Sequence, residues 1–290
     1  MGRWLMVAVA CAVAAPAMPG DPVVRLVRVD GTHTVSVNET LRSIGSRYGI
    51  DPAVLAANNG RSIREPLRVG QQLTLAVAHI VPAMAADGVL TINVPQRMLF
   101  FRTAEGVTSF PVAVGSAGWQ TPTGPFTIVE KELDPTWDVP DSIAREAAAK
   151  GIRLPSRIAP GPDNPLGRHW LRLSVGGVGV HGTNAPASIY QAVTHGCIRL
   201  HPDDIARLFW LVEVDTPGQL VYEPVLLAAE EGEVFLEVHR DIYRFGHDGP
   251  LQTARALAAA QAIDHLVDWN AAARVAASRE GVARPVGKRR

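Results

Sequence analysis

Cysteine is scarce in this chain, with only Cys11 and Cys197 among 290 residues. Cys11 lies in an N-terminal segment that we expect to be removed, so the mature protein would hold one thiol and no internal disulfide. A single remaining cysteine is either buried and inert or chemically reactive. Because Cys197 follows His195 and Gly196 directly, the sequence favours a reactive thiol.

Long apolar runs are also few, and the one at the N-terminus is too short for a membrane span, which needs about 20 residues. Arg3 is followed by an apolar stretch over residues 4–14 and then by Ala15-Pro16-Ala17, the order found in secretory signal peptides. We therefore predict a signal peptide over residues 1–20 and a periplasmic protein. Acylation of Cys11, as in a lipoprotein, is disfavoured because the apolar run before it is short.

An excess of charge of either sign is missing as well. The chain has 28 basic and 28 acidic residues, a formal net charge of +0 with histidine neutral. Without a large basic field, nucleic acid is not an expected partner. The length and apolar content are sufficient for two or three domains, each with its own core.

The first predicted domain spans residues 32–77 and has the order strand, helix, helix, strand. Leu41, Ile44 and Tyr48 follow one another at helical spacing, and Asp51-Pro52 is typical of the start of a second helix. On either side we expect no regular structure: residues 21–29 look like a lead-in, and residues 76–87 look like an apolar linker.

This domain resembles a LysM module, a small βααβ fold that binds glycans containing N-acetylglucosamine. The residues that carry the resemblance are Glu39-Thr40-Leu41-x-x-Ile44, Tyr48-Gly49-Ile50, Leu55-x-x-Asn58 and Leu67-x-Val69-Gly70-Gln71-x-Leu73. The chain departs from the family at His33, where tyrosine is usual, and at Asn38-Glu39, where Gly-Asp is usual. The resemblance implies glycan strands as a partner, although the same apolar positions would also serve a purely structural domain.

The second predicted domain spans residues 88–223 and is rich in short strands separated by turns that contain glycine or proline. We expect a β-sandwich or a curled sheet. Residues 134–168 interrupt this pattern with a Pro- and Gly-rich insert that has a short helical run near residues 143–150, as in a lid or binding loop. Residues 224–290 form a third, partly helical extension. The fold class is therefore α+β: a small βααβ domain, a mostly β domain and a C-terminal helical tail.

The chemistry concentrates between residues 180 and 200, where His181, His195 and Cys197 occur together. A thiol of pKa about 8.5 needs a base to form a thiolate, and it needs donors that stabilise the oxyanion it creates. Zinc bound by these residues and His201 is an alternative. The spacing lacks the usual paired ligands, so we predict no metal.

These residues resemble the catalytic domain of L,D-transpeptidases of the YkuD type. The resemblance is carried by His181-Gly182-Thr183 and Thr194-His195-Gly196-Cys197-Ile198-Arg199-Leu200, and further upstream by Thr121-Pro122-Thr123-Gly124-Pro125-Phe126 and Asn164-Pro165-Leu166-Gly167. It implies that Cys197 is the nucleophile and His181 the general acid/base. His195 is a third catalytic candidate, and Gly182, Thr194, Gly196 and Arg199 belong to the oxyanion or substrate-binding region.

Some of these assignments have ordinary structural alternatives. His195 could simply orient its turn, and Arg199 could pair with Asp203 or Asp204. Those two acids in turn could merely occupy the first turn of a helix that starts at His201-Pro202.

The resemblance implies an enzyme without a cofactor that acts on peptidoglycan stem peptides and reacts with carbapenems. The thiolate would attack the L,D bond after the diamino acid at position 3 of a tetrapeptide stem, release D-alanine and pass the acyl group to an amine. That amine belongs to a neighbouring stem or to a lysine of an outer-membrane lipoprotein. The alternatives are a hydrolase that uses water as acceptor and a non-catalytic wall-binding protein.

Overall fold

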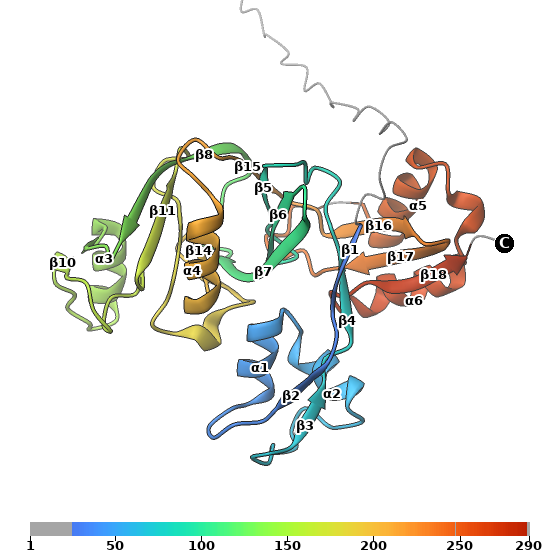
Figure 1. Cartoon of the computed structure of the whole chain (residues 1–290), viewed down its shortest axis with the longest axis horizontal. Helices are drawn as coiled ribbons and strands as arrows, with labels where there is room; N and C mark the ends of the chain where they lie inside the picture. The colour runs from blue at the N-terminus through green and yellow to red at the C-terminus, as the bar shows by residue number, and fades with distance from the viewer. Residues whose placement is uncertain (1–24, 247, 289–290) are drawn as a thin grey trace, which may run out of the picture.

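The structure is a computed structural model that describes residues 25–246 and 248–288, so the predicted signal peptide lies outside the described residues. Figure 1 shows three regions: the N-terminal α1–α2 module, a large sheet with its insert, and the C-terminal β16–β18 unit. Among the described residues, no helix is long and apolar enough to cross a membrane.

The N-terminal module has the predicted order of elements: β2 (Thr32–Thr34), α1 (Leu41–Tyr48), α2 (Pro52–Asn58) and β3 (Gln72–Thr74). Ile44, Leu55 and Leu73 are fully buried in its core. Helix α1 begins at a Thr40 cap that is bonded reciprocally with Ser43. The apolar spacing thus predicted α1 correctly, and Asp51-Pro52 predicted the start of α2.

Each of the two flanking segments, expected to lack regular structure, contains a strand among its described residues. Strand β1 (Leu26–Val29) pairs antiparallel with β4 (Val77–Ile80), and this ribbon runs from the α1–α2 module toward the C-terminal unit (Figure 1). The prediction was wrong because each strand depends on a partner about 50 residues away in the chain, and because Leu26 and Ile80 are buried against the C-terminal Leu226.

The central domain is one nine-stranded sheet with the order β13-β7-β14-β12-β11-β8-β15-β5-β6, in which β6 also pairs with β7. The sheet therefore curls and closes on itself around a core that includes Phe110, Leu171 and Ile198. Its strands are β5 (Leu90–Asn93), β6 (Met98–Thr103), β7 (Gly106–Gly115), β8 (Gly124–Leu133), β11 (His169–Leu173), β12 (Gly179–His181), β13 (Ala192–Thr194), β14 (Ile198–Leu200) and β15 (Pro217–Val221).

Two helical segments accompany this sheet. The insert contains β9 (Trp137–Asp138), α3 (Asp141–Ala149) and β10 (Arg157–Ile158), and α3 confirms the expected helical run. Helix α4 (Pro202–Leu211) begins after a His201 cap, where the sequence predicted a helix to start, and it buries Ile205, Leu208 and Phe209 against the sheet.

The C-terminal residues form more than a helical tail. Strands β16 (Val225–Glu230), β17 (Glu233–Val238) and β18 (Arg284–Lys288) make an antiparallel sheet, which is packed against α5 (Pro250–Ala260) and α6 (Trp269–Ser278). The Ala-rich stretch divides into two helices because Ala262 adopts a left-handed φ of 54° and Asp268 caps α6. Strand β18 was missed because it forms only by pairing with β17, about 50 residues earlier.

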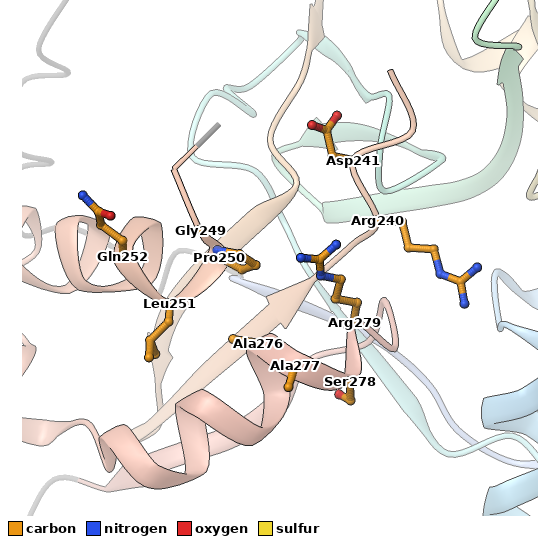
Figure 2. A pocket seen from close by; sticks show the side chains of 10 residues that line it. All are labelled: Arg240, Asp241, Gly249, Pro250, Leu251, Gln252, Ala276, Ala277, Ser278 and Arg279. Carbon is orange, nitrogen blue, oxygen red and sulfur yellow. The ribbon is translucent and has the colours of Figure 1, made fainter. Parts of the chain in front are cut away.

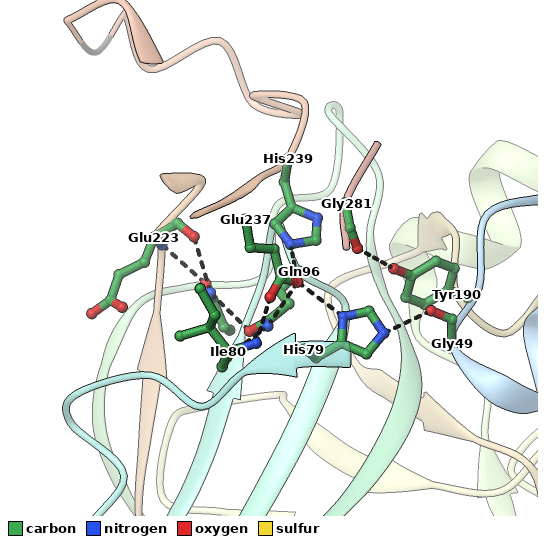
Figure 3. Close-up of polar contacts among 10 residues, drawn as sticks. Gly49, His79, Ile80, Gln96, Tyr190, Glu223, Glu237, His239 and Gly281 are labelled. Atoms are coloured by element: carbon green, nitrogen blue, oxygen red, sulfur yellow. Dashed lines mark hydrogen bonds and ion pairs between the residues drawn. The ribbon is translucent and has the colours of Figure 1, made fainter. Parts of the chain in front are cut away.

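The three regions meet at a buried cluster of polar side chains around Glu237 (Figure 3). Glu237 Oε1 lies 2.9 Å from His79 Nδ1 and 2.8 Å from His239 Nε2, and Gln96 also donates to it. His79 Nε2 lies 3.0 Å from the carbonyl oxygen of Gly49 in the N-terminal module. Both ring nitrogens of His79 thus face oxygen atoms, one of them the Glu237 carboxylate, in a site closed to solvent.

A second polar contact joins the N-terminal module to the central domain. Arg47 on α1 lies 2.8 Å from Asp204 in the first turn of α4, and the Asp204 side chain is almost fully buried. The N-terminal module is therefore attached directly to the helix that follows the Cys197 segment.

Candidate active site

His181 and Arg199 are brought side by side by the parallel pairing of β12 with β14, in which they are register partners. Cys197 precedes β14 directly and lies two residues before Arg199, so its side chain is on the same face of the sheet. The three side chains line one cavity of about 610 Å³, together with Thr194 and His195. The structure thus gathers the five side chains that the sequence singled out between residues 180 and 200.

His181 is arranged to act as a base. Its side chain is almost completely buried, and its Nδ1 lies 2.6 Å from the carbonyl oxygen of Gly182, to which it donates. That bond assigns the proton to Nδ1 and leaves the lone pair on Nε2. Burial, and then the positive charge of Arg199, lower the pKa of His181 to about 3, so the ring is neutral near pH 7.

Trp170 forms the wall beside this histidine. It is the register partner of His181 on β11, and the two rings lie 5.8 Å apart. The indole crosses over Gly179, where an added Cβ would stand only 2.2 Å from the ring. Gly179 is therefore needed so that the Trp170 indole can pack beside His181.

Cys197 holds a protonated thiol in this arrangement. Its Sγ lies 3.7 Å from the carbonyl oxygen of Gly177, a weak contact in which the thiol donates. Burial raises the pKa of Cys197, and the nearby Arg199 opposes that shift only in part. The neutral His181 and the neutral thiol favour proton transfer during the reaction over a permanent thiolate–imidazolium pair.

The turn before Cys197 is held from within by Thr194. Its hydroxyl donates to the carbonyl oxygen of Cys197 at 2.5 Å and lies 3.2 Å from the N–H of Gly196. Gly196 has a φ of +107°, which disfavours any residue with a Cβ. The hydroxyl at position 194 therefore shapes the loop from which the oxyanion donors would come.

His195 faces the insert as well as the cavity. Its Nε2 lies 3.0 Å from Glu146 on α3, and its ring lies 5.1 Å from that of Trp119. Glu146 also accepts hydrogen bonds from Trp119 and Lys150. Lys150, then His195 and Trp119, lower the pKa of Glu146 to about 2, so it is ionised. This contact supports the structural alternative for His195, since it connects the Cys197 loop to the insert.

Arg199 does not pair with Asp203 or Asp204, so that alternative was wrong: both acids face Arg47 instead. One Arg199 nitrogen donates to Ser188 at 2.8 Å, and its buried Nε has no hydrogen-bond partner within the described part of the chain. The guanidinium lines the cavity, where it could bind an acidic group of a ligand.

The insert covers the cavity with Pro140, Ser142 and Ile143, although α3 itself buries no residue. Its base is fixed by Asn164, whose side chain donates to the carbonyl oxygen of Pro135 and accepts from the N–H of Leu166. A helix without a buried face is held mainly by side-chain contacts such as Glu146 with His195. The sequence predicted the insert but not this contact, because nothing local marks Glu146.

A metal centre at these residues has little geometric support. His201 lies at the start of α4, where its Nδ1 accepts from the N–H of Asp203 at 3.3 Å. Over residues 25–246 and 248–288, no group of three or more His, Cys, Asp or Glu side chains could hold a metal ion.

A separate cavity of about 630 Å³ lies in the C-terminal unit (Figure 2). It is lined by Arg240 and Arg279, by the first residues of α5 and by the end of α6. None of its lining residues is a histidine or cysteine, so it offers no counterpart to the Cys197 site.

Comparison with known proteins matches two of the three regions to families. Residues 87–225 match the model of the L,D-transpeptidase catalytic domain (YkuD), and residues 33–76 match that of the LysM domain.

Three curated proteins are similar over long stretches. "Probable L,D-transpeptidase ErfK/SrfK" of Escherichia coli K12 is 36% identical over 228 residues, which cover 76% of this chain and 72% of that protein. "Probable L,D-transpeptidase YcfS" of the same strain is 34% identical over 235 residues, covering 78% and 73%. "Putative L,D-transpeptidase YkuD" of Bacillus subtilis is 30% identical over 189 residues, covering 62% and 93%.

Proposed function

The chain belongs to the L,D-transpeptidase family, and on that premise we propose that it transfers peptidoglycan stem peptides through a thioester on Cys197. The observation that carries this proposal is the shared cavity in which a neutral His181, with its lone pair on Nε2, lines the same space as the Cys197 thiol. A base with a free lone pair and a nucleophile that still holds its proton thus lie on one face of one sheet.

In the first half-reaction, His181 Nε2 takes the thiol proton as Sγ attacks the carbonyl carbon of the L,D bond after the position-3 diamino acid. The oxyanion is stabilised by the backbone N–H of Cys197, since that of Gly196 is used by the Thr194 hydroxyl. When it collapses, the C–N bond breaks, the proton on Nε2 passes to the leaving amine, and D-alanine departs. The product is a thioester between Cys197 and the stem.

In the second half-reaction, an amine attacks that thioester and gives its proton to His181 Nε2. The C–S bond then breaks, and the thiolate recovers the proton from the imidazolium, which restores the neutral pair. Water could attack the thioester in place of the amine, so transfer to an amine requires that water be kept out of the cavity. The insert, which covers the cavity with Pro140 and Ile143, is suited to that purpose.

Arg199 and the LysM module supply the binding part of the proposal. The guanidinium in the cavity suits the carboxylates of a stem peptide, while the module would hold the glycan strand from which the stem extends. Because Arg47 attaches α1 to α4, glycan and stem would be bound at a set separation. We place the protein in the periplasm and propose a neighbouring stem or a lysine of an outer-membrane lipoprotein as acceptor.

The test is to incubate the purified chain with isolated sacculi, digest the glycan and separate the muropeptides. New cross-links between position-3 residues, or lipoprotein attached to stems, would support transfer. Shortened stems alone would mean that water is the acceptor and the protein is a hydrolase.

The matched control is Cys197→Ala, which keeps the fold and removes the nucleophile. If the variant changes the wall as the wild-type chain does, the thioester mechanism fails, and a wall-binding protein becomes the better description.

A further inference from the structure

Residues 239–246 of the C-terminal extension return to the central domain, outside the stretch that matches the catalytic family model. Within this segment, Tyr243 is the residue that enters the core of the central domain. It is buried within the main core of the closed sheet, where it stacks on Tyr222 with ring centroids 5.4 Å apart. A tyrosine at such a depth needs partners for its hydroxyl.

Those partners lie directly behind the Cys197 loop. The Tyr243 hydroxyl donates to the carbonyl oxygen of Gly115 at 2.9 Å and accepts from the N–H of Thr121 at 2.9 Å. It therefore joins the two ends of the turn between β7 and β8.

Thr121 carries the connection onward. Its buried hydroxyl accepts from the N–H of Gly115 at 2.8 Å and donates to the carbonyl oxygen of Gly196 at 2.9 Å. Two hydrogen bonds, one at each end of Thr121, thus lead from Tyr243 to Gly196, the residue before the nucleophile.

The orientation of the Gly196 carbonyl decides where the next N–H points. The peptide unit is planar and trans, so the N–H of Cys197 is directed opposite to the Gly196 C=O. Because Thr121 holds that oxygen on the core side, the Cys197 N–H is turned away from the core. Gly196 alone would not fix this direction, since glycine tolerates many backbone angles.

We infer that Tyr243 is a positioning residue for the transfer reaction: through Thr121 it fixes the Gly196–Cys197 peptide so that its N–H can stabilise the oxyanion. This inference rests on the proposed function, because it assumes that Cys197 forms a thioester. It also gives the C-terminal extension a part in catalysis, since the extension supplies a side chain that the central domain lacks.

The test substitution is Tyr243→Phe, which removes the hydroxyl and keeps the ring in the core. Two rates are measured on the full chain: acylation of Cys197 by a tetrapeptide-stem substrate, and alkylation of Cys197 by iodoacetamide. Acylation passes through an oxyanion, whereas alkylation does not. We expect acylation to slow by about tenfold, less than the loss of a whole oxyanion donor, with KM and the alkylation rate near wild type.

Tyr190→Phe is the matched control. Its hydroxyl joins the central domain to the C-terminal unit by donating to the carbonyl oxygen of Gly281 at 3.4 Å (Figure 3). Within the described part of the chain, no hydrogen bond connects that hydroxyl to Gly196. We expect this variant to acylate at the wild-type rate. Thr121→Ser, which keeps the hydroxyl, should also remain active, whereas Thr121→Val should reproduce the Tyr243→Phe defect, and combining the two should add little.

The outcomes distinguish a failure of the proposed function from a failure of the positioning role of Tyr243. A wild-type chain that forms no thioester refutes the proposed function. A wild-type chain that acylates normally, with a Tyr243→Phe variant that acylates equally fast, refutes the positioning role alone. An equal fall in acylation and alkylation would mean general damage to the site and would also overturn the inference.

Discussion

His33 and Glu39 lie in contact: the Nε2 atom of the histidine is 2.7 Å from a carboxylate oxygen of the acid. These are two positions at which the N-terminal module departs from the residues usual in LysM modules. The same carboxylate oxygen accepts the N–H of Ser36, and the other histidine nitrogen lies 3.1 Å from the Tyr48 hydroxyl. The unusual residues thus form one hydrogen-bonded group that fixes the turn before α1.

We predict that His33 and Glu39 are energetically coupled. His33→Ala and Glu39→Ala should each lower the local stability of the module by about 1 kcal/mol, because each removes hydrogen bonds at a half-buried site. The double variant should be less harmful than the sum by about 0.5 kcal/mol. Hydrogen exchange of the α1 amides measures the opening free energy. Strict additivity would show that the contact contributes nothing.

A carbapenem should form a covalent adduct on Cys197, as the family resemblance implies. The intact mass of the wild-type chain should rise by the mass of the drug after treatment, and peptide mapping should place the adduct on residue 197. Cys197→Ala should remain unmodified. A wild-type chain of unchanged mass, in a sample that is active on sacculi, would contradict the assignment of the nucleophile.

The proposed roles of Cys197 and His181 rest on short local motifs, which are visible in the sequence alone. Local signals also predicted three helices: apolar residues at helical spacing for α1, Asp51-Pro52 for the start of α2, and His201-Pro202 for the start of α4. A strand pair carries no such local mark when its members are far apart. This is why β1, β4 and β18 were missed, each being stable only through pairing and burial against a distant segment.

Side-chain contacts across the fold were beyond prediction for the same reason. Glu146 and His195 are 49 residues apart, His79 and Glu237 are 158 apart, and neither acid stands in a recognisable motif. For Arg199, the sequence suggested a local contact that the structure does not contain. Nearby acids suggested an ion pair, but the register of β14 turns its guanidinium into the cavity, and Asp204 is taken by Arg47 from another domain.

The two histidines of the site should respond differently to substitution. His181→Gln should slow acylation by about 100-fold or more, because it removes the general base. His195→Gln should cost much less, since glutamine can still donate to Glu146 on α3. Acylation rates of the two variants, measured with the same stem substrate, decide between a catalytic and a bracing role for His195. Equal losses would make His195 a member of the catalytic machinery.

The pH dependence of acylation should reflect the low pKa of His181. A base must be deprotonated to act, so activity is present above its pKa and is lost as pH falls through it. Because burial and Arg199 hold the pKa of His181 at about 3, the acidic limb should lie well below pH 6.5. The profile of kcat/KM against pH measures it. A limb near 6.5 would mean that His181 is not buried as described.

The buried ion pair between His79 and Glu237 should be the most sensitive point of the junction between the three regions. Glu237→Gln removes the negative charge and leaves the His79 ring buried without its carboxylate partner. Breaking such a pair costs about 3 to 5 kcal/mol. Glu233→Gln is the matched control: Glu233 is on the same strand, but it pairs with Lys288 at the surface, so the change should cost under about 1 kcal/mol. Urea unfolding of both variants gives the comparison.

The same pair predicts the direction of a pH effect on stability. Burial alone would raise the pKa of Glu237, but His79 and His239 lower it from 4.5 to about 2. A carboxyl whose pKa is lower in the folded chain stabilises the fold above its unfolded value, and that stabilisation is lost as pH falls toward the folded value. The stability difference between wild type and Glu237→Gln should therefore be largest above pH 5 and shrink steadily between pH 4.5 and 2. If the difference stays constant over that interval, Glu237 is not ionised in the folded protein, and the charged pair at the junction does not exist.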